Sequence, residues 1–100
     1  MTDTLPSYTP GRAADWSLIP EYMIGGLRRY IENGIGPGSF LTALLSNDLR
    51  RTFECADDEN RTCIENYVRF LYSYAPSECW GSADKFDVWC RQGGLRGIAA

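Results

Sequence analysis

The sequence contains no histidine, and Lys85 is the only lysine among its ten basic residues. Without histidine, the chain lacks the commonest general base and the usual activator of a serine or cysteine nucleophile. A glycine-rich phosphate loop is missing as well, because the run 34–38 (Gly-Ile-Gly-Pro-Gly) fits neither the Walker nor the dinucleotide-binding spacing. These absences predict a protein that is not an enzyme and binds no cofactor.

No two of the four cysteines are separated by only two residues, as zinc ligands usually are. The cysteines are Cys55, Cys63, Cys79 and Cys90. We therefore predict free thiols that pack as small apolar side chains, and no metal site. The even number of cysteines leaves structural disulfides as the alternative.

Long hydrophobic runs are also missing. No apolar stretch approaches the ~18–20 residues that a membrane-spanning helix requires. The residues Met1 to Pro6 do not combine a basic start with an apolar stretch, so the pattern of a secretory signal is absent. We expect the protein to remain in the cytoplasm, where reducing conditions keep thiols free.

Positive charge is in deficit, since the formal net charge is −3. A general nucleic-acid-binding protein would present a basic surface, so this balance argues against one. Nine of the ten basic residues are arginine, whose planar guanidinium makes the bidentate contacts favoured at interfaces. A GC-rich genome would produce the same bias without a functional cause, and both explanations stay open.

The chain does have apolar residues in helical periodicity. Apolar residues make up 44% of the sequence, enough to form the core of one domain. Their helical spacing resumes after residues 20, 38, 47, 57 and 82, and no segment alternates like a strand. We predict an all-α fold, a small single-domain bundle of four to five short helices. The domain is expected at 17–95, between a flexible N-terminal arm at 1–16 and a frayed C-terminus at 96–100.

Capping residues predict several helix boundaries. Pro20 suits the first helical position, and Gly34 suits the left-handed cap that ends the same helix. Asp57 and Asp58 are expected to cap the longest helix, running to about Tyr74. Its buried face would contain Ile64, Tyr67, Val68 and Leu71, while Phe70 or Tyr72 would lie partly exposed. Ser82 would cap the last helix, and Gly93 and Gly94 would end it.

Two features allow either a structural or a functional explanation. Gly25 and Gly26 lie inside the first helix, where together they cost about 1–2 kcal/mol relative to alanine. A crossing helix that needs a close approach, or a docking surface for a partner, would offset that cost. Tyr8 and Trp16 are the only anchors of the expected arm, and they either lie along the domain or reach for a partner.

The candidate partner-binding residues are acidic and aromatic. They are Glu54, Asp57, Asp58, Glu59, Tyr72 and Trp80. The four acids surround a predicted helix start, where carboxylates favour the positive end of the helix dipole even without a function. As a patch, they would dock on a basic surface such as a nucleic-acid channel in another protein. The two aromatics would be interface anchors, or would cover the edge of the core.

Two blocks of the chain are distinctive in combination. The first contains Ile19–Met23, Gly25–Glu32, Gly34, Pro37-Gly38, Phe40-Leu41 and Asn47–Leu49. The second contains Leu71-Tyr72, Tyr74–Pro76, Cys79, Gly81-Ser82, Trp89 and Gly93–Leu95. Together they resemble a set of small phage and prophage proteins of proteobacteria, and within that set the chain is most similar to the type I-F anti-CRISPR family numbered six. The resemblance covers about residues 17–95.

The resemblance implies a phage-encoded inhibitor that acts in the cytoplasm of a bacterial host cell. Such a protein binds the type I-F RNA-guided surveillance complex near its large subunit and the adjacent backbone subunit, and it stops target DNA from pairing with the guide. We expect a monomer that makes no direct contact with nucleic acid. The matching residues are structural in kind, so the resemblance assigns no contact residue.

Two alternatives stay open. One is a non-catalytic phage accessory protein of the same fold that binds another host protein. The other is a DNA-binding regulator, in which segments 38–46 and 47–55 form a helix-turn-helix that presents Arg50 and Arg51 to the major groove. The turn between these segments lacks a clear glycine and the acidic run follows it, which argues against the DNA-binding alternative.

Overall fold

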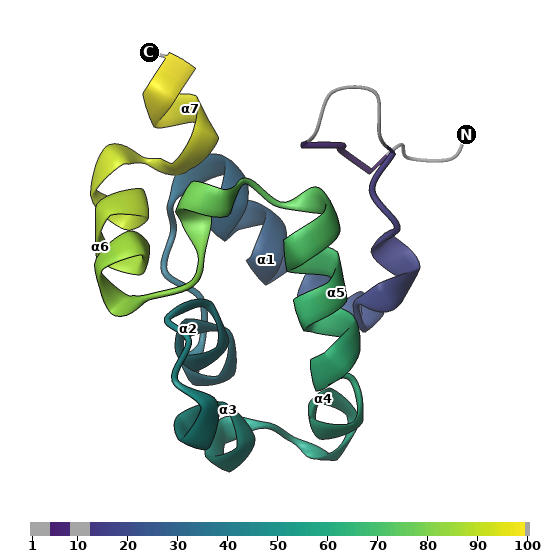
Figure 1. The fold of residues 1–100 in the computed structure, drawn as a ribbon. Coiled ribbons are helices and arrows are strands. Elements are labelled where there is room, and N and C mark those ends of the chain that lie inside the picture. Colours follow the sequence, from purple (N-terminus) through teal and green to yellow (C-terminus); the bar gives the residue numbers. More distant parts are fainter. Residues whose placement is uncertain (1–4, 9–12, 100) are drawn as a thin grey trace.

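The computed structural model describes residues 5–8 and 13–99, and in these ranges the chain forms helices and loops without a strand (Figure 1). The all-α prediction is therefore confirmed. The described elements are η1 (Trp16–Leu18), α1 (Glu21–Asn33), α2 (Ser39–Leu45), α3 (Leu49–Cys55), α4 (Asp58–Thr62), α5 (Ile64–Tyr74), η2 (Ser77–Cys79), α6 (Ala83–Gln92) and α7 (Gly94–Ala99). These helices are shorter and more numerous than predicted. Pro10 and Gly11 of the expected arm, and Ala100, lie outside the described residues.

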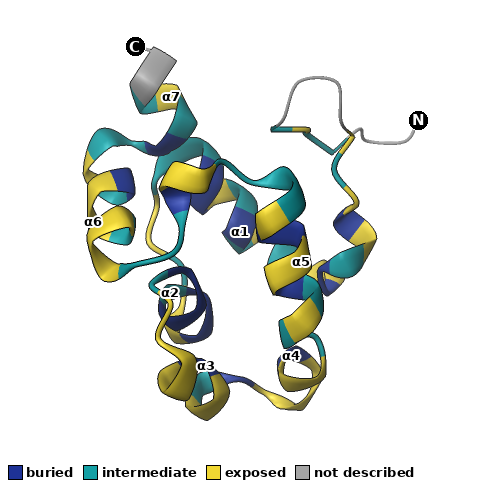
Figure 2. Cartoon of the chain, viewed as in Figure 1, coloured by how far each residue is buried: buried dark blue, intermediate teal, exposed yellow. Residues whose placement is uncertain are grey.

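The helices enclose one core. In Figure 1, α6 lies on the left and α5 on the right, with α1 behind and between them and α2 and α3 below. α2 is buried over most of its length, whereas α3 is mostly exposed (Figure 2). A helix that is apolar on several sides is typical of a central position. The aromatic residues of the core are Trp16, Tyr30, Phe40, Tyr67, Phe70 and Trp89.

The first long helix begins one residue later than predicted. Pro20 precedes α1 as its N-cap, with an extended ψ of 136°. Gly34 ends the helix in the left-handed conformation, at φ 69°, as its sequence position predicts. Of the predicted buried face, Leu27, Tyr30 and Ile31 are buried and Met23 is half-buried.

The helix predicted from Asp57 to Tyr74 is broken at Cys63 into α4 and α5. Asp57 caps α4, because its Oδ1 accepts a hydrogen bond of 2.7 Å from the N–H of Asn60. The Cys63 N–H bonds to the carbonyl of Asn60 three residues earlier, which tightens the last turn of α4. Asn60 is buried and accepts a second bond, of 2.7 Å, from the hydroxyl of Tyr67. This buried pair ties the short helix to α5.

Tyr8 and Trp16 both lie along the domain. Trp16 is only 6% exposed, and its ring packs on Phe70 with the centroids 4.6 Å apart. The Trp16 indole N–H donates to the carbonyl of Pro6 at 2.8 Å, and the Tyr8 hydroxyl donates to the carboxylate of Glu32 at 2.8 Å. Trp16 therefore belongs to the domain core, which corrects the predicted boundary between arm and domain.

The C-terminal residues expected to fray form α7 through Ala99, and this helix packs on α1. The approach is close, since a Cβ built on Gly94 would lie 2.6 Å from the backbone nitrogen of Gly34. Gly94 also has a positive φ of 69°, a conformation that a side chain would strain. Arg96 approaches Glu32 at 3.9 Å. The segment 96–99, which the sequence predicts to fray, is thus helical in the structure.

Candidate interaction surface

α5 carries more apolar residues than its inward face holds. Tyr67, Phe70 and Leu71 are buried, whereas Val68 and Tyr72 are 42% and 83% exposed. Tyr72 is thus the aromatic residue that this helix leaves outside, and Phe70 is not. The prediction that Val68 is buried is wrong, because Val68 lies about 100° around the helix from Tyr67, the centre of the inward stripe.

Two apolar residues of α3 also face outward. Leu49 is 69% exposed, and Phe53 is exposed as well, although both continue the helical spacing of the preceding segment. The buried position of α3 is taken by Thr52, whose hydroxyl donates to the carbonyl of Asp48 at 2.6 Å. Asn47 has a positive φ of 61° and redirects the chain between α2 and α3, so the apolar spacing does not carry one buried face across both helices.

Trp80 connects these side chains into one surface. Trp80 lines two depressions, of about 350 and 120 Å³. The larger is also lined by Leu71, Tyr72, Ala75, Ser77, Gly81 and Lys85, and the smaller by Leu44, Asn47, Leu49, Thr52, Ile64 and Val68. We call the surface formed by Leu49, Val68, Tyr72 and Trp80 the apolar cleft.

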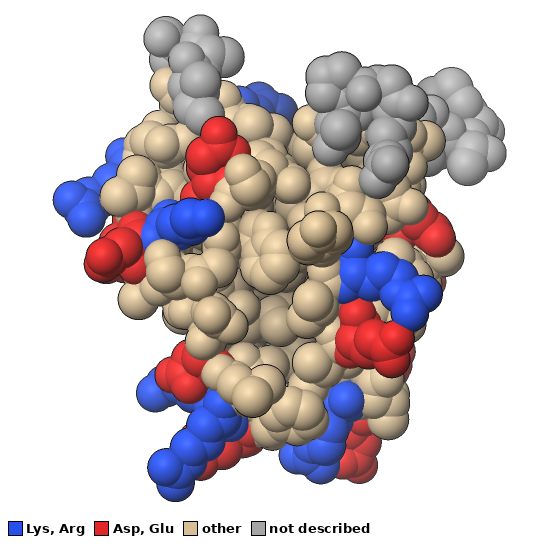
Figure 3. All heavy atoms as spheres, in the orientation of Figure 1, with Lys and Arg blue, Asp and Glu red and all other residues tan. Residues whose placement is uncertain are grey.

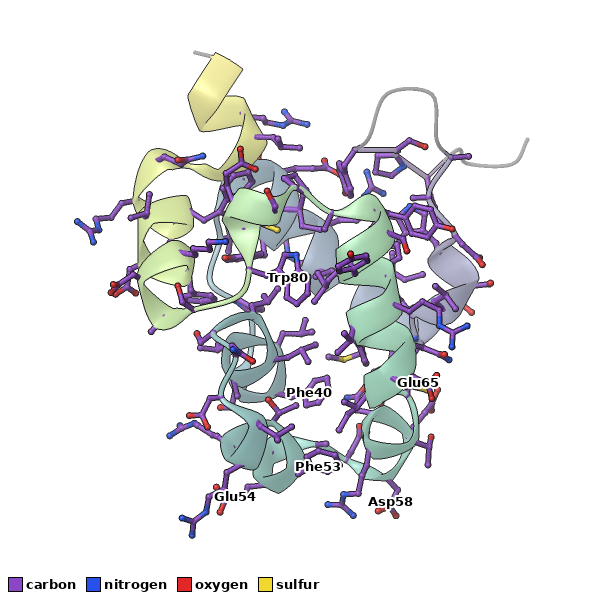
Figure 4. The ribbon with its side chains drawn as sticks, viewed as in Figure 1. Phe40, Phe53, Glu54, Asp58, Glu65 and Trp80 are labelled. Carbon is purple, nitrogen blue, oxygen red and sulfur yellow. The ribbon has the colours of Figure 1, made fainter. Side chains whose placement is uncertain are left out.

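The surroundings of the apolar cleft are charged. In Figure 3 the centre of the face is uncharged, and charged groups border it towards the outline of the molecule. Trp80 lies near the centre of the same view in Figure 4, and Phe53 lies below it. Glu65, at the right edge, pairs with Arg69 at 2.6 Å. An apolar centre with a polar rim is typical of protein–protein interfaces.

The predicted acidic residues lie at the edge of this face, and most have partners within the protein. Glu54 pairs with Arg50 at 3.4 Å, and Asp58 pairs with Arg61 at 3.6 Å. Figure 4 shows Glu54 and Asp58 directed outward from different helices, with Phe53 between them. Exposed pairs of this kind contribute only about 0–1 kcal/mol, so their carboxylates can exchange an internal arginine for an external cation.

Asp57 has a structural role of its own. One carboxylate oxygen caps α4, and the other accepts a hydrogen bond of 2.6 Å from the Tyr22 hydroxyl in α1. The Tyr22 bond is the largest cause of a lowered pKa for Asp57, and the N–H of Asn60 is the next. The same bond raises the pKa of Tyr22 to about 12. Glu59, by contrast, makes no ion pair within the described part of the chain.

The cysteines all carry free thiols in the structure. Burial raises the pKa of the Cys79 thiol to about 12 and also raises that of Cys90. A thiol with a raised pKa stays protonated at neutral pH and is a poor nucleophile. Across residues 5–8 and 13–99, no three cysteine, aspartate or glutamate side chains are grouped as metal ligands would be. In the same ranges, no helix has both the length and the apolar character that crossing a membrane needs.

Comparison of the chain with protein-family models, with curated proteins and with solved structures found no match. Of the predicted contact residues, the fold brings Tyr72 and Trp80 together and leaves the acids at the periphery. The fold also adds Leu49 and Val68, which were not predicted from the sequence as contact residues. The available signal was the surplus of apolar residues in α5, since one helix face cannot bury all of them.

Proposed function

We propose that this chain is a non-catalytic inhibitor that binds the type I-F RNA-guided surveillance complex and blocks hybridisation of its target DNA. The apolar cleft supports the binding part of the proposal. The resemblance of the two sequence blocks to the type I-F anti-CRISPR family numbered six supports the choice of partner. In this proposal the protein acts as a monomer in the host cytoplasm, near the large subunit and the adjacent backbone subunit.

The observation that carries the proposal is the exposure of Tyr72 beside Trp80 in a concave surface. Aromatic side chains bring a large contact area with few rotatable bonds, and they dominate the energetics of many interfaces. Leu49 and Val68 extend the same surface on the other side of Trp80. Burying one such side chain against a partner contributes about 1.5–3 kcal/mol.

The acids at the edge of the face supply a second contact in this proposal. A surveillance complex presents lysine and arginine along its DNA path, because it must hold phosphates. Glu54 and Asp58 would exchange their internal arginines for these groups, and Glu59 needs no exchange. A rigid competitor of this kind excludes DNA without any chemistry.

The test is duplex-DNA binding by a purified type I-F surveillance complex that has been preincubated with increasing amounts of this protein. We expect DNA binding to be lost at near-stoichiometric amounts. Normal DNA binding followed by failed cleavage would move the block to nuclease recruitment and contradict the hybridisation step. An unchanged complex in both assays would contradict the proposed partner.

A pair of matched variants tests whether the apolar cleft makes the contact. Tyr72→Ala removes the most exposed aromatic of the cleft, whereas Val88→Ala removes an exposed apolar side chain of α6 that lines neither depression. We expect Tyr72→Ala to need at least tenfold more protein for inhibition, which is about 1.4 kcal/mol. Val88→Ala should inhibit like the unmodified chain. Equal inhibition by both variants would remove the cleft from the interface.

A further inference from the structure

The helical glycines Gly25 and Gly26 are not explained by packing within the described part of the chain. A Cβ built on Gly26 would meet only Leu41 Cδ1 and Arg29 Nη2, each at an ordinary 3.9 Å. A Cβ on Gly25 would meet the flexible end of Arg29, at 3.2 Å. Among residues 5–8 and 13–99, only side-chain atoms come near these two glycines, so of the two explanations the crossing helix with a close backbone approach is not supported. Gly26 would accept alanine, which favours helix formation more than glycine does.

Two nearby glycines also have free space where a side chain would lie. Gly36 and Gly38 lie between α1 and α2, and a Cβ on either would meet nothing within 4 Å. Neither has a positive φ, so the backbone does not require glycine at these positions. With Gly26, they line a groove of about 330 Å³. The other lining residues of this α1 groove are Tyr22, Met23, Arg29, Ile35, Pro37 and Leu41.

The α1 groove has mostly apolar walls and a cation among them. Arg29 lines this groove and a neighbouring depression of about 290 Å³. Its side chain makes no ion pair or hydrogen bond within the described part of the chain, whereas the adjacent Arg28 pairs with Glu32 at 3.3 Å. A guanidinium offers five donors in a planar fork that matches a carboxylate or a phosphate. Arg29 is exposed, so an anionic group that binds in the groove would replace water at this guanidinium.

Charge at the end of the groove distinguishes a single carboxylate from a run of phosphates. Tyr22, at that end, hydrogen-bonds to Asp57, and Glu59 also acts on Tyr22 electrostatically. A nucleic acid carries a negative charge at every nucleotide and would bring phosphates against these acids. A protein segment with one carboxylate between apolar side chains matches a lone guanidinium between apolar walls.

We propose that the α1 groove docks a protein segment that places one acidic side chain on Arg29 and neighbouring apolar side chains against Ile35 and Pro37. The open space at Gly26, Gly36 and Gly38 admits the backbone of that segment. The groove shares no lining residue with the apolar cleft. The inference therefore goes beyond the proposed function, and either can fail without the other.

The experiment is a selection of random 12-residue peptides, displayed as a library, on the immobilised full chain. Enriched peptides are expected to share an aspartate or glutamate next to an apolar residue. Amide NMR shifts caused by a selected synthetic peptide should concentrate in residues 22–41. Arg29→Gln should weaken that peptide about tenfold or more, because it removes a charge-assisted contact. Arg91→Gln, at an exposed arginine of α6, is the matched control and should bind normally.

Gly26→Ala should change peptide binding and protein stability in opposite directions. Alanine in place of this helical glycine should raise the Tm by about 4–8 °C. The same methyl group narrows the groove and should weaken the selected peptide. Asp87→Ala, at an exposed position of α6, is the control and should leave peptide affinity unchanged.

Several results would overturn the inference. Enriched peptides without an acidic residue, or peptides that bind Arg29→Gln equally well, would remove the carboxylate contact. The Gly26→Leu variant, whose side chain fills the groove, is used as a second immobilised protein. Peptide enrichment on the unmodified chain that is no greater than on this variant would show that the groove is not the binding site. NMR shifts at residues 22–41 on adding duplex DNA would assign the groove to phosphates instead. A concentration-dependent dimer that Ile35→Glu dissociates would assign it to a second copy of the chain.

Discussion

Trp80 and Trp89 are close together in the sequence, yet one lies at an open surface and the other is buried in the core. Trp89 is 1% exposed, and its indole N–H donates to the carbonyl of Tyr30 at 3.0 Å. The Tyr30 hydroxyl in turn donates to the carbonyl of Cys79 at 2.6 Å. The buried polar groups of both side chains therefore have hydrogen-bond partners inside the protein. Trp80 lines two open depressions, and its indole N–H makes no hydrogen bond within the described part of the chain.

The aromatic residues of this chain therefore lie in two different kinds of surroundings. Around Trp89 they close the core and bond to backbone carbonyls that water cannot reach. Around Trp80 they border an exposed surface, and in the proposed function a partner would displace water from it. Substitutions in the first region should therefore affect the stability of the isolated chain, and those in the second should affect binding.

The largest expected effect is that of Trp89→Ala. This change leaves a cavity and removes the bond to Tyr30, so we expect it to lower the free energy of unfolding by about 3–5 kcal/mol. Urea denaturation followed by circular dichroism measures the change. Trp80→Ala should lower the free energy of unfolding by less, because the Trp80 ring is only partly buried. Equal losses of stability for the two tryptophan variants would contradict the difference between the two regions.

Tyr72→Ala should affect binding more than it affects the stability of the isolated chain. Because Tyr72 is exposed, its loss should change the free energy of unfolding by no more than about 0.5 kcal/mol. In the proposed function, the loss of this side chain from the centre of the interface should cost about 2 kcal/mol of binding to the surveillance complex. Denaturation and titration calorimetry on the same sample give both numbers. A Tyr72→Ala variant that is destabilised but still inhibits fully would show that Tyr72 contributes to stability and not to binding.

Tyr67→Phe probes a polar contact inside the core. The variant removes the hydroxyl that donates to Asn60 Oδ1 and leaves that buried oxygen without its donor. We expect a loss of about 1–3 kcal/mol in the free energy of unfolding, with faster exchange of the α4 amide hydrogens. Hydrogen-exchange NMR detects the local part of this effect. Unchanged exchange in α4 would contradict the role of this pair in holding the short helix.

Reversing two acids at the edge of the apolar cleft should have a smaller effect. Asp58→Lys with Glu59→Lys leaves the capping Asp57 intact, so the fold should be retained. We expect inhibition to weaken by a few-fold at low salt and the difference to shrink at high salt, since exposed charges are screened. The readout is inhibition of DNA binding at two salt concentrations. A salt-independent effect would point to lost packing instead of charge.

The smallest expected effect concerns the link between Tyr22 and Asp57. Because the hydroxyl lowers the pKa of Asp57, the ionised carboxylate stabilises the fold above its ordinary pKa of 3.8, and this contribution is lost as the pH falls through the lowered value. The Tm of Tyr22→Phe should therefore be below that of the unmodified chain at pH 7, and the gap should close in acid. Thermal scans between pH 7 and pH 2 test this, with Tyr72→Phe as the control. A gap that widens in acid would contradict the sign.

Helix ends that depend on local chemistry were predictable from sequence. Ser82 caps α6 through the N–H of Lys85, and Gly34 and Gly93 end α1 and α6 in the left-handed conformation. These residues act on backbone groups within a few positions of themselves, so no knowledge of the rest of the chain is needed. The break at Cys63 was missed, because it involves a buried pair between Asn60 and Tyr67 that only the folded core creates.

The candidate surface was predicted in part for a related reason. Tyr72 and Trp80 were predicted as contact residues because the helix ending at Tyr74 has too many aromatic residues for one buried face, and because Trp80 was expected in a loop. Leu49 and Val68 were missed, since apolar spacing identifies residues that share a helix face but not which face the neighbouring helices cover. The sequence also predicted the four acids as contact residues, but it did not show that Glu54 and Asp58 pair with arginines about one helical turn away.

Composition, periodicity and capping residues alone specified an all-helical domain, much of its core and most of its helix ends, because these depend on each helix's own axis and on nearby backbone groups. Tertiary structure decided which apolar side chains stay outside. It left Leu49, Val68 and Tyr72 around Trp80, and it left Arg29 without an ion pair to any described residue, beside Gly26 in the α1 groove. Both outcomes depend on how separate helices are oriented against one another, and that orientation follows from the packing of the whole core.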